Sequence, residues 1–162
     1  MVVYRIHHHH DPTRPEPMVP GWTGPARHGG WSRTRPLIVA RVHNDVIGYL
    51  RLSCRQPSGI WTIRGLAVHQ SCQGRGIGGR LLRLAIRYTG EHCRGRQLLS
   101  FVRPDNNISM HLHLGLGFTP VSWPPSGPGH GRSRPPAAAS ERLHTCLALT
   151  LPAAYSRYSS ST

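Results

Sequence analysis

The sequence predicts an α/β protein built around a mixed β-sheet with helices packed against it. Apolar stretches of strand length recur between turn-forming residues in the middle of the chain. Two stretches with helical periodicity separate or follow the later strands, so part of the sheet is joined by crossover helices. The third observation is the segment Leu66–Leu82, in which a short apolar strand leads through a glycine cluster directly into a helix.

The first 36 residues are predicted to form an irregular arm. Met1–Ile6 is a candidate first strand, whereas residues 7–36 repeat Pro and Gly without a helical or strand period. The run His7–His10 lacks a second set of ligands, so we expect these side chains to be solvated and assign no metal site to the chain.

The folded domain is predicted to span residues 37–151. Its first two strands, Leu37–Val42 and Val46–Leu52, flank the tight turn His43-Asn44-Asp45, which is typical of a hairpin. The next strand, Ile60–Val68, leads into the glycine cluster.

The glycine cluster predicts an anion-binding site. Gly74, Gly76, Gly78 and Gly79 stand where the helix begins. The first turn of a helix leaves backbone N–H groups without partners, and the helix dipole adds partial positive charge there. Glycine lets a phosphate approach those donors closely and permits unusual backbone angles. Because each glycine inside a helix costs about 1 kcal/mol relative to Ala, four of them indicate a function.

Two amphipathic helices are predicted. The first has an apolar face and an expected C-cap at Gly90; that face consists of Ile77, Leu81, Leu84, Ala85 and Tyr88. The second is capped by Asp105 or Asn106 and ends at Gly117, and its expected apolar stripe is Ile108, Leu112 and Leu116.

The remaining elements complete the sheet. Gln97–Val102, between the helices, is predicted to be a short buried strand, and Phe118–Trp123 resumes extended structure. Residues 124–140 are rich in Pro and Gly and are expected to form a flexible surface loop. Leu143–Leu151 is the predicted final strand, and residues 152–162 are expected to be a frayed tail.

Two segments together resemble the GNAT superfamily of acyl-CoA-dependent N-acyltransferases. The family signature Gln/Arg-x-x-Gly-x-Gly/Ala stands here as Gln73-Gly74-Arg75-Gly76-Ile77-Gly78. The second match is Val102–Phe118, VRPDNNISMHLHLGLGF, which is similar to the next strand and helix of the family. Within the superfamily the likeness is strongest to small-molecule amine acetyltransferases of the phosphinothricin-resistance kind, which carry His where many relatives have Tyr. The fold that the resemblance implies is a mostly antiparallel sheet that splays open between its fourth and fifth strands, Ile60–Val68 and Gln97–Val102.

The resemblance also implies a binding mode for acetyl-CoA, the co-substrate of the family. Its pyrophosphate is expected on the loop from Gln73 to Gly79, and the cofactor-binding residues there are Gln73, Gly74, Arg75, Gly76, Ile77, Gly78 and Gly79. Leu66, Ala67 and Val68 are expected to pair with the pantetheine arm through their main chain, and Asn106 to bond to it from the opposite side. The alternatives are a plain core strand for Leu66–Val68 and an N-cap for Asn106.

His113 occupies the general-acid position of the family and is the predicted catalytic residue. Its role would be to protonate the departing thiolate after an acceptor amine attacks the thioester. The alternative is an ordinary histidine on a helix surface. Thr62 and Phe101 stand where relatives often place a glutamate base, so either His111 or His144 acts as base or the amine loses its proton before it binds. The implied acceptor is a small-molecule primary amine, with a protein amino terminus, or a coenzyme A-binding module without activity, as alternatives.

Composition limits the other partners. The chain carries a formal net charge of +14, and all 20 of its basic Lys and Arg residues are Arg. This charge attracts polyanions non-specifically, but the arginines are scattered, so no specific nucleic-acid partner is expected. Four cysteines without C-x-x-C spacing indicate reduced thiols, and no signal peptide or membrane-spanning stretch is visible. We therefore expect a cytoplasmic protein with no membrane partner, and leave a homodimer open.

Overall fold

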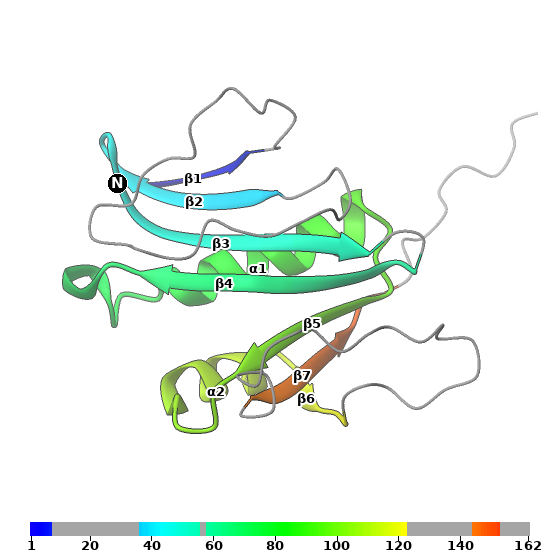
Figure 1. Cartoon of the computed structure of the whole chain (residues 1–162). Helices are drawn as coiled ribbons and strands as arrows, with labels where there is room; N and C mark the ends of the chain where they lie inside the picture. The colour runs from blue at the N-terminus through cyan, green and yellow to red at the C-terminus, as the bar shows by residue number, and fades with distance from the viewer. Residues whose placement is uncertain (8–35, 56–57, 123–143, 153–162) are drawn as a thin grey trace, which may run out of the picture.

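The computed structural model describes residues 1–7, 36–55, 58–122 and 144–152. It is a mixed α/β structure in which two helices pack against one seven-stranded sheet (Figure 1). Residues 8–35 of the predicted arm, the 124–140 loop and all but the first residue of the tail lie outside the described residues. No helix within the described ranges is long and apolar enough to cross a membrane.

The sheet has the strand order β1-β2-β3-β4-β5-β7-β6. The strands are β1 (Val2–His7), β2 (Leu37–Val42), β3 (Asp45–Arg55), β4 (Ile60–Val68), β5 (Gln97–Val102), β6 (Thr119–Pro120) and β7 (Thr145–Thr150). All neighbouring pairs are antiparallel except β4 and β5, which are parallel. This arrangement confirms the predicted fold class, and the bounds of β2, β4 and β5 are those expected from the sequence.

The predicted splay between β4 and β5 is also confirmed. These strands pair from Ile60 opposite Gln97 only as far as Ile63 opposite Ser100. β4 then continues from Arg64 to Val68, where it pairs with β3 alone. On the β3 side the register shifts at the same place, because Arg51 lies opposite Gly65 while Leu52 lies opposite Ile63. Arg64 is therefore the extra residue of a β-bulge, a feature that bends and twists a strand.

The helices and short helical turns differ in part from the prediction. The helical elements are η1 (Gln70–Cys72), α1 (Ile77–Arg87), η2 (Tyr88–His92) and α2 (Asn107–Leu114). Gly90 is not the C-cap of α1, because the helix continues directly into the π-helical turn η2, where Gly90 is buried. The hydroxyl of Thr89 donates to the carbonyl of Ala85 at 2.8 Å, and Tyr88 packs edge-to-face against Trp61. Burial of this wider turn in the core extends the helical structure past the position that the sequence predicted.

The second helix is shorter than predicted, and one residue of its apolar stripe is wrong. α2 ends at Leu114 with Gly115 as its C-cap, and Gly117 lies in the following turn with a φ of 89°. Ile108 is 81% exposed. It lies in the first turn of α2. The residues of this segment that pack on the main core are Met110, Leu112 and Leu116, and His113 is buried. Of the predicted extended segment after the helix, residues 118–122 are described, and within them Thr119–Pro120 forms a strand.

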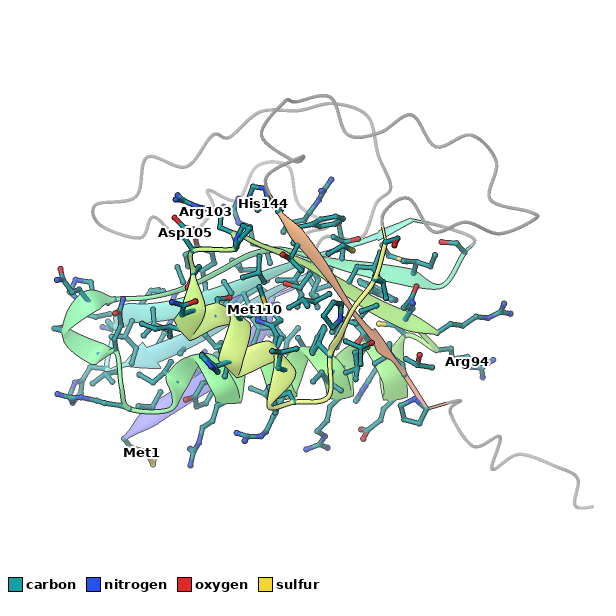
Figure 2. All side chains as sticks on the ribbon, turned by 90° about the horizontal axis from the view of Figure 1, so that it is seen from below. Met1, Arg94, Arg103, Asp105, Met110 and His144 are labelled. Carbon is teal, nitrogen blue, oxygen red and sulfur yellow. The ribbon has the colours of Figure 1, made fainter. Side chains whose placement is uncertain are left out.

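The main core fills the space between the sheet and the helices. Leu50 and Leu52 of β3 and Leu81 and Leu82 of α1 are at most 1% exposed there. Both helices lie on the same side of the sheet (Figure 2), and α2 joins this core through Met110, Leu112 and Leu116. The opposite face has separate small clusters, one of them built on Leu37, Val39 and Tyr49.

Candidate active site

The open half of β4, Arg64–Val68, provides an exposed main-chain edge. No described strand pairs with this segment on the side where β5 diverges. An edge strand presents N–H and C=O groups that can hydrogen-bond to another extended chain. Leu66 and Val68 pack on the main core while Ala67 packs on the opposite cluster, so the side chains fix the strand and leave its main chain at the edge. The core role and the predicted binding role of Leu66, Ala67 and Val68 are thus compatible.

The loop after β4 is held in place by its own polar side chains. The side-chain amide of Gln73 donates to the carbonyl of Val68 at 3.1 Å. His69 Nδ1 lies 2.9 Å from the hydroxyl of Ser71, and the main-chain N–H of His69 donates to Ile47 at 2.8 Å. Gln73 therefore fastens the loop to the end of β4, a positioning role that the sequence motif alone does not reveal.

Gly74 and Gly76 are required by backbone conformation. Both have φ of 74°, and a Cβ built on either would meet nothing within 4 Å. The left-handed region is unfavourable for residues with a Cβ, so conformation, and not crowding, selects glycine at these two positions. The same open space leaves room for a ligand directly above the loop.

The N-terminus of α1 fits an anion. Gly76 is its N-cap, no side chain caps it, and its first turn contains no acidic residue. The first intrahelical bond runs from Arg80 N–H to the Gly76 carbonyl at 3.0 Å, which leaves the N–H groups of Ile77, Gly78 and Gly79 ahead of it. Arg75 and Arg80 are exposed beside them. These donors and charges suit a pyrophosphate.

Gly78 and Gly79 serve packing as well. A Cβ on either would lie 3.5 Å from the side chain of Leu112 on α2. Their missing side chains allow α2 to pack closely over the start of α1. This brings Asn106, the N-cap of α2, toward the same end of the sheet, where its Oδ1 accepts from Ser109 N–H at 3.0 Å. The predicted N-cap role of Asn106 is therefore confirmed, and its contact with a cofactor stays a prediction.

His113 is buried. Its side chain is 1% exposed and packs edge-to-face on Phe118 with ring centroids 5.0 Å apart, so the alternative of a surface histidine is wrong. His113 Nδ1 lies 2.7 Å from the carbonyl oxygen of Ser109. A carbonyl only accepts, so Nδ1 carries the proton and Nε2 presents its lone pair when the ring is neutral. Nε2 is buried and has no hydrogen-bond partner among the described residues.

Burial keeps this ring neutral. Desolvation lowers the pKa of His113 below its ordinary value, and the hydrogen bond to the Ser109 carbonyl opposes this shift only in part. At neutral pH the ring is therefore uncharged, and Nε2 is the atom that can take up or release a proton.

A comparison with models of known protein families identifies the family of this chain. The profile of the acetyltransferase (GNAT) family matches residues 4–118, which is more than half of the chain. The chain belongs to the GNAT acetyltransferase family. No curated protein matches the sequence.

Several solved structures share the GNAT fold with this chain. The IAA acetyltransferase of Bacillus cereus is 22% identical, with a TM-score of 0.56 over 72% of this chain and 78% of that one. The ribosomal-protein-S18-alanine N-acetyltransferase of Escherichia coli is 18% identical, with a TM-score of 0.56 over 77% and 74%. The yncA protein of Salmonella typhimurium, solved with its cofactor acetyl-CoA, is 24% identical, with a TM-score of 0.54 over 79% and 69%.

The candidate bases of this GNAT domain lie in two different places. His111 is exposed on α2, where its Nδ1 lies 2.8 Å from the carbonyl of Asn107. His144 lies near Arg103 and Asp105, where β5 ends and β7 begins (Figure 2). The hydrogen bond from Arg103 is the main reason that the pKa of Asp105 is lowered, and the charge of His144 adds to it. The two candidate bases thus belong to different parts of the fold, His111 to α2 and His144 to the start of β7.

Sequence reasoning missed three contributors to the site. The Ser109 carbonyl orients His113, Arg64 forms the bulge where β4 leaves β5, and Arg51 stacks over Tyr49 beside that bulge. A helical i, i+4 spacing connects Ser109 with His113, and the alternation of a strand puts Tyr49 and Arg51 on one face. Those two spacings were the available signals, whereas a bulge leaves none in the residue pattern.

Proposed function

We propose that this GNAT protein is an N-acetyltransferase that transfers an acetyl group from acetyl-CoA to a primary amine by direct attack within a ternary complex. The observation that carries the proposal is the coincidence of two features at one edge of the sheet. The open half of β4 ends where the glycine loop begins, and the uncapped N-terminus of α1 follows at once. The extended pantetheine arm and the pyrophosphate of coenzyme A match these features in order.

In this proposal each sequence-predicted residue has a binding role. The main-chain donors of Gly74–Gly79 bind the pyrophosphate, with Arg75 and Arg80 adding positive charge, while Gln73 holds the loop in position. Leu66–Val68 pair through their main chain with the pantetheine arm, and Asn106 contacts the arm from the side of α2. The structure of the Salmonella yncA protein with acetyl-CoA supports this choice of co-substrate.

His113 is the proposed proton carrier of the reaction. Acetyl-CoA supplies the acetyl group as a reactive thioester, and the acceptor nitrogen loses a proton as it attacks. Because Nδ1–H is held by the Ser109 carbonyl, His113 takes up that proton at Nε2 and then donates it to the departing thiolate. The low pKa of the buried ring favours release of the proton once the thiolate forms. General acid catalysis of this kind contributes roughly 10²–10⁴-fold.

The proposed acceptor is a small-molecule amine. His113 in place of the more usual Tyr supports the likeness to acetyltransferases of the phosphinothricin-resistance kind, and nourseothricin acetyltransferase, 20% identical, shares the fold with a TM-score of 0.56. The Escherichia coli relative is, by its name, an N-acetyltransferase of an alanine in ribosomal protein S18. A protein amino terminus is therefore the second candidate acceptor. A homodimer stays a prediction.

A rival function is supported by one observation. Thr62 and Phe101 bring no carboxylate to the splay, and the acidic side chains that the structure describes are Asp45, Glu91 and Asp105. A coenzyme A-binding module without catalytic activity would have no need of a base. It predicts that acetyl-CoA binds while no amine is acetylated.

Thermal unfolding of the full chain tests the proposal first. Acetyl-CoA at 100 times its dissociation constant is expected to add about 2.7 kcal/mol to the free energy of unfolding, and polyphosphate at matched charge is the control for the basic surface. Release of free thiol in the presence of primary amines then separates the enzyme from the rival module. An equal shift with both anions would contradict the cofactor site.

A further inference from the structure

The first turn of α2 is held more by hydrogen bonds than by packing. Asn107 and Ile108 begin the helix, and both residues are exposed. The helix has eight residues, and helices shorter than about 12–15 residues are marginal in water on their own. The N-cap at Asn106 is therefore an important restraint on this turn.

Asn106 is fixed through both its main chain and its side chain. Its main-chain N–H donates to the carbonyl of Arg103 at 3.0 Å, and its own carbonyl accepts from Met110 N–H at 2.9 Å. The side-chain oxygen Oδ1 accepts from Ser109 N–H at 3.0 Å. The side-chain nitrogen Nδ2 donates to no group in the part of the chain that the structure describes. Asn106 can therefore cap the helix and contact a ligand at the same time.

The cap is connected to His113 through Ser109. The two bonds from Asn106 hold the peptide units on both sides of Ser109, and the carbonyl of Ser109 accepts from His113 Nδ1 at 2.7 Å. The hydrogen bond that one ring nitrogen makes determines which nitrogen of a neutral histidine carries the proton. The position of the Ser109 carbonyl therefore determines the tautomer of His113.

A second group of Ser109 can favour the opposite tautomer. The hydroxyl of Ser109 lies 3.4 Å from the same Nδ1 of His113, and a hydroxyl donates as well as accepts. If the carbonyl moves away, the hydroxyl can donate to Nδ1, and the ring proton then resides on Nε2. A neutral ring in that form has no lone pair on Nε2 with which to take up a proton from the attacking amine.

We propose that Asn106 is a positioning residue for His113, because its cap on Ser109 holds the ring in the tautomer with the proton on Nδ1 and the lone pair on Nε2. Nε2 is buried and has no hydrogen-bond partner among the described residues, so no described group selects the tautomer from that side. The inference rests on the proposed acetyltransferase function, in which Nε2 takes the proton of the amine and passes it to the thiolate. The Nδ1 proton stays in place throughout.

NMR of the full chain labelled with ¹⁵N measures the tautomer directly. A ring nitrogen with a proton and one with a lone pair differ in chemical shift, and the signals of His113 are those absent from His113→Gln. At about pH 8, above the ordinary pKa of histidine, the unchanged protein should show the proton on Nδ1. Asn106→Ala should show both tautomers. Asn106→Ser restores an uncharged cap and should return the proton to Nδ1.

Kinetics separates the two roles of Asn106. Asn106→Ser and Asn106→Ala both lose Nδ2, so the KM for acetyl-CoA should rise in both. At saturating acetyl-CoA, kcat should fall in Asn106→Ala by about 2- to 30-fold relative to Asn106→Ser. This range corresponds to an N-cap worth about 0.5–2 kcal/mol.

Asn107→Ala is the matched control. It removes the same side chain from the next position, which is also exposed, and leaves the cap on Ser109 intact. Its tautomer and its kcat should equal those of the unchanged protein. If Asn106→Ala does not fold, Asn106→Gly takes its place, because glycine also lacks the side-chain bond but is tolerated at an N-cap.

The two measurements distinguish this inference from the function on which it rests. A single Nδ1 tautomer in the uncapped variant, or equal kcat values for Asn106→Ala and Asn106→Ser, would overturn the positioning role while the acetyltransferase function stands. If the unchanged protein releases no thiol with any amine, the acetyltransferase function falls. A mixed tautomer in Asn106→Ala that Asn106→Ser corrects would still support the positioning of His113 by the cap.

Discussion

The two halves of β4 have the same strand conformation but different surroundings. Ile60–Ile63 is paired on both sides, by β3 and by β5, and its residues Trp61 and Ile63 are 3% and 7% exposed. Arg64–Val68 is paired by β3 alone, and its core-facing side chains are only partly buried. The first half therefore contributes stability, whereas the second half provides the edge at which a ligand can bind. The bulge at Arg64 is the point where one role changes to the other.

The largest expected effect is on catalysis at the open half. His113→Ala removes the atom that we propose carries the proton, so kcat should fall by roughly 10²–10⁴-fold. Thiol release at saturating acetyl-CoA measures this, and calorimetry measures whether acetyl-CoA still binds. His113→Tyr, which introduces the residue more usual in the family, should recover activity above that of the Ala variant. Equal rates for His113→Ala and the unchanged protein would remove His113 from the mechanism.

The next effect concerns stability in the paired half. Trp61→Ala empties a buried site against Tyr88, and we expect a loss of about 3–5 kcal/mol in the free energy of unfolding, measured with urea. Trp61→Phe should cost less, since it keeps most of the ring and removes an indole N–H that is buried without a hydrogen-bond partner among the described residues. Acetyl-CoA affinity of the folded Phe variant should not change. A loss of affinity at unchanged stability would contradict the division of β4 into two roles.

A smaller effect is expected in the loop that follows the open half. Gly76→Ala places a Cβ at a φ of 74°, which costs about 1–2 kcal/mol. It should also weaken acetyl-CoA binding by displacing the first N–H groups of α1. Gly90→Ala is the matched control, because Gly90 has no positive φ and the nearest side-chain atoms lie 4.0 Å from the new Cβ. The control should keep its affinity, and unfolding curves with and without acetyl-CoA measure both quantities.

The sequence predicts the glycine loop and the start of α2 well because local backbone conformation selects the residues at these positions. Gly74 and Gly76 have a positive φ, and Asn106 caps α2, so local rules find all three. The predicted end of α1 was wrong because the tertiary packing of Tyr88, and not the capping preference of Gly90, determines where that helix ends. The exposure of Ile108 was missed for a similar reason, since helical spacing gives a face but not the neighbour that covers it.

His113 is both a buried residue and the proposed proton carrier, and the pH dependence of the free energy of unfolding tests the effect of its burial. His113 is buried on the core side of α2 and has a lowered pKa because of that burial. In the unfolded chain its pKa returns to about 6.5, so the unfolded state binds more protons than the folded state as pH falls below that value. The contribution of His113 to the free energy of unfolding should therefore be constant above about pH 6.5. Below that pH it should decrease on acidification, at a slope of at most about 1.4 kcal/mol per pH unit. Urea titrations at several pH values, compared with His113→Gln, measure the slope that belongs to this ring. An unchanged slope in the variant would mean that folding does not lower the pKa of His113, and the effect of burial on the proposed proton transfer would be refuted.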